Sequence, residues 1–174
     1  MRRFNPIVVF LTAVILFGCN PGQSESTTDN SSNQESNKEH VRQFFESVWS
    51  TGDLTNRDSF LSPEYVGHAA GMPGPMDREA WTAWFEGFRA AFPDATFTIE
   101  DMVAEGDRVA ARITMRGTQT GVLAGIPPTG NAVVVTGMSI ERIRDGLIVE
   151  GWNENDALGM FMQIGSFPPP PPPM

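Results

Sequence analysis

The sequence predicts an α+β domain in which a curved antiparallel sheet wraps around helices from its N-terminal half. Apolar residues recur at helical spacing before residue 92 and alternate as in strands from residue 95 onward. A run of helices followed by a run of about four to six strands packs with the helices on one face of the sheet. A curved sheet around a long helix leaves a cone-shaped cavity, the kind of site that takes a small ligand.

The helices are indicated by their caps and apolar stripes. Ser36-Asn37-Lys38-Glu39 is a capping box, and the apolar stripe that follows it continues to Gly52. A short helix is expected over 53–61, and Asp77 is the N-cap of a further helix that ends before Pro93. The last helix is expected over 157–164. The helix after Asp77 carries one face of large aromatic residues: Trp81, Trp84, Phe85, Phe88 and Phe92.

Four strands are predicted, over 96–106, 107–118, 131–143 and 147–154. Gly106-Asp107 joins the first two as a tight turn, and Asp145-Gly146 is a strong hairpin signal between the last two. The Gly- and Pro-rich segment 121–130 is expected to be an irregular loop. The strands therefore form an antiparallel meander.

The two ends of the chain are expected to lie outside this domain, which spans 38–167. Residues 1–18 have two arginines, an apolar run and a small residue before Cys19, as in a secretory signal. Leu16-Phe17-Gly18-Cys19 resembles the lipobox of bacterial lipoproteins, which implies lipidation of Cys19 and export to a membrane, with the outer membrane preferred. The polar segment 19–37 is then a flexible tether, and residues 168–174 form a polyproline tail.

Composition excludes several classes of function. The formal net charge of −9 disfavours nucleic acid as a partner, because so acidic a surface repels phosphate. Two distant histidines and a single cysteine make no cluster of metal ligands. The glycine-rich segment 117–130 lacks the lysine of a phosphate-binding loop.

Several motifs occur together and in order. They are Phe92-Pro93-Asp94, Gly117-Thr118-Gln119-Thr120-Gly121, Pro127-Pro128-Thr129-Gly130, and Trp152 followed four residues later by Asp156. Over residues 38–165 this set resembles the SnoaL-like polyketide (ester) cyclases, which belong to the nuclear transport factor 2-like superfamily of α+β cones. The resemblance also suggests a homodimer through the outer sheet face.

The resemblance implies an intramolecular aldol ring closure without a cofactor, on a small hydrophobic carbonyl compound. The catalytic aspartate of the family falls on Asp156, and its early-strand histidine on His68. Aromatic residues of the pocket would be Trp81, Trp84, Phe85 and Trp152, with Gln119 and Asn153 as hydrogen-bond donors. Such a pocket would supply the low dielectric that proton abstraction needs.

Two readings of these residues remain open. Asp156 before Ala-Leu-Gly-Met is also a helix N-cap, and His68 is equally well a structural or exposed histidine. The whole domain is accordingly either a cyclase with Asp156 as general base or a tethered, non-catalytic module that binds a small apolar ligand. An Asp156 buried within reach of His68 or Gln119 would support the enzyme, whereas an Asp156 that points to solvent and is bonded only to backbone amides would count against the enzyme.

Overall fold

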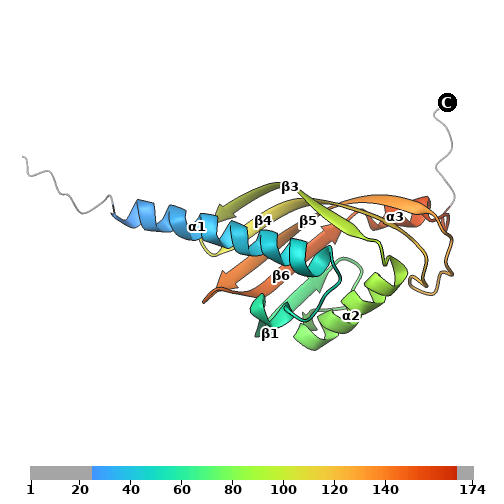
Figure 1. Ribbon diagram of the computed structural model, residues 1–174, viewed down its shortest axis with the longest axis horizontal. Coiled ribbons are helices and arrows are strands. Elements are labelled where there is room, and N and C mark those ends of the chain that lie inside the picture. The colour runs from blue at the N-terminus through green and yellow to red at the C-terminus, as the bar shows by residue number, and fades with distance from the viewer. Residues whose placement is uncertain (1–24, 168–174) are drawn as a thin grey trace, which may run out of the picture.

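The computed structural model describes residues 25–167, which form three α-helices and one six-stranded sheet. The helices lie against the concave side of the curved sheet (Figure 1), so the predicted α+β class is confirmed. The signal segment, Cys19 and the polyproline tail lie outside the described residues. No helix within 25–167 is long and apolar enough to cross a bilayer. The elements in chain order are α1 (Glu25–Phe44), η2 (Phe45–Trp49), η3 (Arg57–Ser59), β1 (Leu61–Ala69), β2 (Met76–Asp77), α2 (Arg78–Ala91), β3 (Thr96–Glu105), β4 (Arg108–Thr118), β5 (Ala132–Arg144), β6 (Leu147–Asn155) and α3 (Ala157–Gln163).

Helix α1 begins at Glu25, eleven residues before the predicted capping box, so the expected tether is helical from Glu25 onward. The segment 25–37 has no glycine or proline to interrupt a helix, and Lys38 Nζ lies 2.6 Å from Glu35 Oε1 one turn away. These first turns project beyond the edge of the sheet (Figure 1). The buried part of the helix starts at Val41, where the predicted apolar stripe begins.

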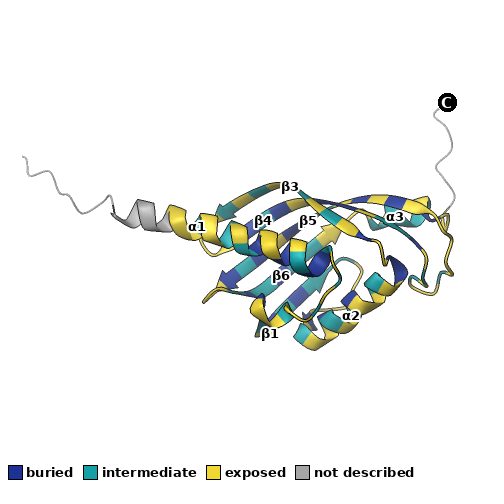
Figure 2. Cartoon of the chain, in the orientation of Figure 1, coloured by how far each residue is buried: buried dark blue, intermediate teal, exposed yellow. Residues whose placement is uncertain are grey.

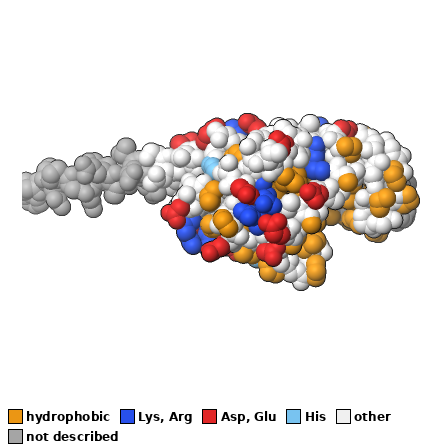
Figure 3. Space-filling view, turned by 60° about the horizontal axis from the view of Figure 1, so that its bottom comes forward, with side chains coloured by type: hydrophobic (Ala, Val, Ile, Leu, Met, Phe, Trp, Pro, Cys, Tyr) orange, Lys and Arg blue, Asp and Glu red, His pale blue; other side chains and the backbone are white. Residues whose placement is uncertain are grey.

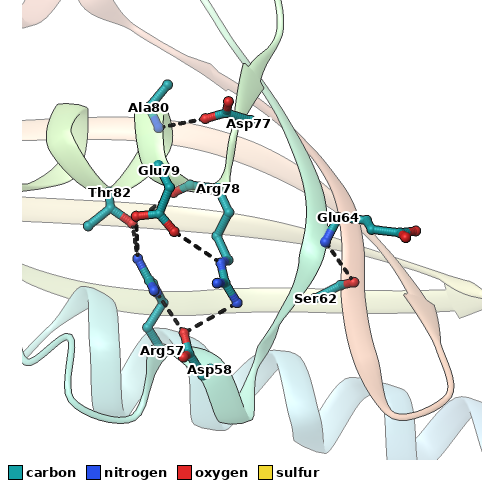
Figure 4. Close-up of polar contacts among 9 residues, drawn as sticks. All are labelled: Arg57, Asp58, Ser62, Glu64, Asp77, Arg78, Glu79, Ala80 and Thr82. Atoms are coloured by element: carbon teal, nitrogen blue, oxygen red, sulfur yellow. Dashed lines mark hydrogen bonds and ion pairs between the residues drawn. The ribbon is translucent and has the colours of Figure 1, made fainter.

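The short helix expected over 53–61 is reduced to the single turn η3, and Leu61 already belongs to β1. Pro63 lies in the part of β1 where its register against β6 shifts, between Leu61 and Val66. A proline is tolerated there because it lacks the N–H that a regular ladder needs. An ion-pair network fixes η3 to the first turn of α2, with Arg57 and Arg78 reaching Asp58 and Glu79 (Figure 4).

The strand order is β2-β1-β6-β5-β4-β3. The predicted meander β3-β4-β5-β6 is antiparallel throughout, and the Asp145-Gly146 hairpin has both turn residues at positive φ. The prediction of a purely antiparallel sheet is wrong in one place, because β1 pairs in parallel with β6. Helix α2 carries the chain from β2 at one edge to β3 at the opposite edge, which leaves β1 beside the last strand.

The core lies between the helices and the concave face of the sheet, where the buried residues gather (Figure 2). Val41, Phe44, Phe45 and Val48 of α1 and η2 pack on this inner face. Alternation decides which strand residues reach it: in β4, Val109, Ala111, Ile113 and Met115 are buried, while the three arginines 108, 112 and 116 are exposed.

Candidate active site

An apolar pocket of about 650 Å³ lies at the end of the cone where α3 closes the sheet. Its walls come from η2, α2, the inner face of the sheet, the loop 119–131 and α3. Hydrophobic side chains gather toward the same end of the molecular surface (Figure 3). The aromatic residues that line it are Phe45, Trp49, Trp84, Phe88, Phe97 and Phe161. The polar residues that line it are Thr136, Asn153, Glu154 and Asn155.

The aromatic face of α2 divides between the pocket and the core. Trp84 and Phe88 stack with ring centroids 6.1 Å apart and line the pocket. Trp81 and Phe85 stack at 5.2 Å in the core, where both are almost fully buried, and neither lines the pocket. The expectation that Trp81 and Phe85 contact a ligand is therefore corrected. Trp84 and Phe88 lie three residues farther along α2 than Trp81 and Phe85, in the C-terminal half of the helix, which is the part that borders the pocket.

Asp156 is the N-cap of α3. Its Oδ1 accepts a hydrogen bond from the Gly159 N–H at 2.8 Å, and its side chain is exposed. A Cβ on Gly159 would collide with the Asp156 carboxylate, so the absence of a side chain at Gly159 leaves room for this carboxylate. Asn155 and Ala157, on either side, line the pocket, whereas Asp156 itself does not. The structure thus places Asp156, the predicted base, beside the pocket. It caps α3 there, and it contacts no histidine among the described residues.

Gln119 does not face the pocket either. It is fully buried, and its Nε2 donates to the carbonyl oxygens of Gly121 and Pro127 while its Oε1 accepts from Thr129 N and Oγ1. Both ends of the amide are satisfied within the loop 119–131. The predicted substrate donor is therefore a structural residue that shapes the loop from which Leu123 and Ala124 line the pocket.

The other glycine and aspartate motifs also fix this loop. Asp94 Oδ1 accepts from Thr118 N at 2.7 Å, which ties the segment after α2 to the end of β4. Gly121 N donates to Ala91 O, and a Cβ on Gly121 would collide with the backbone of Ala90. These motifs therefore build the wall of the pocket, whatever chemistry takes place inside it.

His68 and Trp152 lie on the outer face of the sheet, opposite the pocket. They are cross-strand partners whose rings stack at 5.4 Å, and His68 Nε2 lies 3.0 Å from Glu150 Oε1. Glu150 in turn pairs with Arg142 at 2.7 Å. The expectation that His68 and Trp152 face the pocket is corrected because alternation gives the inner positions to Gly67, Gly151 and Asn153.

One group that the sequence-based reasoning missed is Glu141 on β5. It is fully buried, and burial raises the pKa of its carboxyl to about 8, an effect that the Ser139 hydroxyl partly offsets. A signal was available, since Glu141 is in phase with Val133, Val135 and Ile143 in the alternation of β5. Tyr65 lies beside it, and its pKa is raised by burial and by the nearby Glu141 charge.

The described residues hold no group of three or more His, Cys, Asp and Glu side chains that could bind a metal ion. The chemistry available around the pocket is therefore that of carboxyl, amide and hydroxyl groups at the edge of an apolar chamber. Such a chamber strengthens any hydrogen bond to charge that develops in it.

Comparison with known proteins identifies the family. A model of the SnoaL-like polyketide cyclases matches residues 39–164. This chain belongs to the SnoaL-like polyketide cyclase family. Aklanonic acid methyl ester cyclase DnrD from Streptomyces peucetius is 30% identical over 134 residues, which cover 75% of this chain and 92% of the relative.

Solved structures agree with this assignment. IdmH from Streptomyces antibioticus is 35% identical with a TM-score of 0.67, over 74% of this chain and 98% of that one. AclR from Streptomyces galilaeus, named as a putative hydroxylase, is 28% identical with a TM-score of 0.72, over 79% of this chain and 86% of that one, so this likeness bears on the fold and not on the reaction. Family and relatives support the expectation of a cyclase-type enzyme, and the family is one of small hydrophobic polyketide substrates.

Proposed function

We propose that this SnoaL-like protein closes a ring in a hydrophobic carbonyl compound bound in the apolar pocket, by an intramolecular aldol reaction with Asp156 as general base. The observation that carries the proposal is the position of Asp156 between Asn155 and Ala157, both of which line the pocket. Its Oδ1 accepts a hydrogen bond from the Gly159 N–H, and its Oδ2 accepts none from the described residues. A base at the edge of an apolar chamber is suited to removing a proton α to a carbonyl.

The reaction needs no external oxidant or reductant. The carboxylate takes a proton from the carbon between activating carbonyl groups, and the electron pair of that C–H bond becomes an enolate. The enolate carbon attacks a ketone or aldehyde of the same molecule to form the new C–C bond, and the resulting alkoxide takes up the proton that the carboxylate removed, which restores the base. The side-chain amides of Asn153 and Asn155 are the candidates for donating hydrogen bonds to the two oxyanions.

The substrate should be uncharged. No Lys, Arg or His is among the described residues that line the pocket, and the rim carries Glu154. A carboxylate buried there would lose its hydration without gaining a partner, which is strongly unfavourable. A methyl ester fits this chamber where the free acid does not, in keeping with the methyl ester in the name of the 30% identical cyclase.

The test is Asp156→Asn, assayed with aklanonic acid methyl ester and other neutral polycyclic esters by chromatographic detection of the cyclised product. Asparagine is a good N-cap, so the helix should keep its cap while the base is lost. Turnover should fall by about 10²- to 10⁴-fold with little change in ligand affinity.

Asp77→Asn is the matched control. Asp77 caps α2 through the Ala80 N–H at 2.8 Å, the same geometry in a position that does not line the pocket. It should leave turnover unchanged. If Asp156→Asn turned over as fast as Asp77→Asn, Asp156 would be a cap only. Binding of the esters without turnover by the unaltered protein would favour the non-catalytic binding module, which the exposed, amide-bonded Asp156 also supports.

The location and assembly of the protein are further parts of the proposal. The resemblance of residues 16–19 to a lipobox supports a lipid-anchored, exported protein, and Cys19→Ala should abolish both radiolabelled palmitate incorporation and membrane fractionation. The exposed apolar residues Val134, Met138 and Ile140 on the outer face of β5 support a homodimer there. Light scattering of Ile140→Glu, at a position that does not line the pocket, against the unaltered protein would show whether that face holds two copies together.

A further inference from the structure

A line of polar residues runs through the apolar core toward the pocket. Ser139 and Glu141 occupy successive inner positions of β5, and each is about 1% exposed. Same-face neighbours on a strand are about 7 Å apart. Uncompensated polar groups are costly inside a core, so two of them in a row point to a function beyond packing.

Two glycines make room for the deeper end of this line. A Cβ on Gly151 would lie 2.5 Å from Glu141 Oε2 and 2.7 Å from the Tyr65 hydroxyl oxygen. A Cβ on Gly67, the partner of Gly151 on β1, would lie 3.0 Å from the Tyr65 ring. The ring therefore lies across both glycines, and its hydroxyl and the Glu141 carboxyl converge over Gly151.

No cation among residues 25–167 forms an ion pair with Glu141. Arg142, the next residue, lies on the outer face with Glu150, and the inner-face partners of Glu141 are Val109 on β4 and Gly151 on β6. His40 on α1 packs against Phe60 at 5.2 Å, and α2 contributes Trp81 against the Tyr65 ring. Tyr65 is thus the titratable group that faces it. The carboxyl, with its pKa raised by burial to about 8, is uncharged at neutral pH, and its Oε2 has no hydrogen-bond partner among the described residues.

The other end of the line reaches the ligand pocket. Ser139 is the direct cross-strand partner of Asn153, which lines the pocket. Asn153 shares the inner face with Gly151, two residues earlier on β6. Ser139 Oγ is buried and has no hydrogen-bond partner among the described residues. Directly opposed Cβ atoms are about 4.5–5.5 Å apart, so rotation of the Asn153 side chain can bring its amide within reach of this hydroxyl.

We propose that Glu141 is a positioning residue for the pocket: as a neutral acid it acts through Ser139 to fix which end of the Asn153 amide faces the ligand. A neutral Glu141 donates its O–H toward Ser139, whose own hydroxyl then donates to Asn153 Oδ1, and the Asn153 NH₂ group is left to donate to a ligand carbonyl. An ionised Glu141 instead accepts a hydrogen bond from the Ser139 hydroxyl. The Ser139 oxygen then accepts from the Asn153 NH₂ group, and the carbonyl end of Asn153 turns toward the pocket. The inference rests on the proposed function only in requiring that the pocket bind a carbonyl compound.

The experiment uses two neutral probes, 9,10-anthraquinone, which has carbonyl acceptors, and anthracene, which has none. Binding to the protein is followed by quenching of the pocket tryptophans Trp49 and Trp84 between pH 6 and 9.5. Anthraquinone affinity should fall about 3- to 10-fold between pH 7 and 9, the effect of losing one hydrogen bond. Anthracene affinity should stay constant.

Three variants test the line of polar groups from Glu141 through Ser139 to Asn153. Glu141→Gln keeps a neutral donor and should bind anthraquinone with no pH dependence. Ser139→Ala interrupts the line and should also be independent of pH, so the proposal stays testable should Glu141→Gln fold poorly. Glu150→Gln changes the outer-face carboxylate and should keep the full pH dependence of the unaltered protein.

The outcomes separate the two proposals. An equal fall for both probes, or the same pH profile in Glu141→Gln and the unaltered protein, would overturn the positioning role and leave the cyclase proposal standing. Normal pH-dependent binding with no turnover of any ester would overturn the cyclase proposal alone. Failure of both probes to bind at pH 7 would overturn both, because the pocket would then not be a site for aromatic carbonyl compounds.

Discussion

Glutamate side chains on the inner and outer faces of the β5–β6 pair differ in burial and in their partners. Glu141 faces inward opposite Gly151, and one rung along the ladder Arg142 faces outward opposite Glu150. The outer glutamate has Arg142 at 2.7 Å and His68 at 3.0 Å, while the inner one has Tyr65 and a serine hydroxyl. Two adjacent rungs of the same strand pair therefore carry a buried neutral acid and a paired surface carboxylate.

This contrast shows that residue type alone does not identify a functional group in this fold. His68 and Trp152 are suited to a catalytic pocket and lie on the face that has none. Glu141 belongs to a type that is almost always exposed, yet it is fully buried on the inner face, with Ser139 between it and the pocket. Strand phase, and not the identity of the side chain, decides between the two faces.

The largest predicted difference between the faces is in the pH dependence of stability. The unfolded chain releases the Glu141 proton above pH 4.5, while the folded protein holds it up to about pH 8. The contribution of Glu141 should therefore lower the free energy of unfolding as pH rises from 4.5 to 8, by up to about 5 kcal/mol, and then level off. Urea denaturation of Glu141→Gln should lack this slope, whereas Glu150→Gln should retain it. Equal slopes in both variants would contradict the buried neutral acid.

The next contrast is between the two tryptophans. Trp81→Ala should cost about 3–5 kcal/mol, because Trp81 is 2% exposed and stacks on Phe85 in the core. Trp152→Ala removes the stack with His68 on the outer face and should cost about 1 kcal/mol. Both are measured by chemical denaturation. A loss at Trp152 as large as that at Trp81 would indicate that a partner covers the outer face.

The smallest difference between two variants is expected at Gly151, which makes room for Glu141 and Tyr65. Gly151→Ala should cost about 1–3 kcal/mol, because the added methyl group meets Glu141 and Tyr65 at once and one of them must move. Gly74→Ala is the control, since its added methyl group meets nothing within 4 Å and its backbone is not in the left-handed region. Thermal unfolding of both variants gives the comparison. An unchanged melting temperature for Gly151→Ala would show that Glu141 or Tyr65 moves aside at little cost in stability.

Much of the fold could be predicted because its signals are local. Asp77 caps α2 as expected, Asp145-Gly146 turns the hairpin, and the alternation in 96–118 gives β3 and β4 with their buried faces. The early start of α1 and the reduction of residues 53–61 to one turn were missed, since polar helical turns and strand β1 leave little periodicity in the sequence.

The site was less predictable than the fold. Trp84 and Asn153 line the pocket, but Trp81, Phe85, Gln119, His68 and Trp152 do not. For Gln119 the reason is a loop that folds back on itself, so that carbonyls and a threonine from residues 121–129 occupy both ends of the amide. For Asp156 the structure shows the cap, through its hydrogen bond to Gly159. Its role as a base stays a prediction, since only its neighbours Asn155 and Ala157 line the pocket.

The sequence by itself determined most of the elements, the family and the position of Asp156 at a strand-to-helix junction, because caps, turns and alternation act over a few residues. Only the tertiary structure decided what those residues face. The parallel pairing of β1 with β6 joins residues some 80 positions apart, and it places His68 beside Glu150 and Tyr65 beside Glu141. No local pattern records such a contact, since the free energy that selects it comes from burying one whole face of the sheet against α1 and α2.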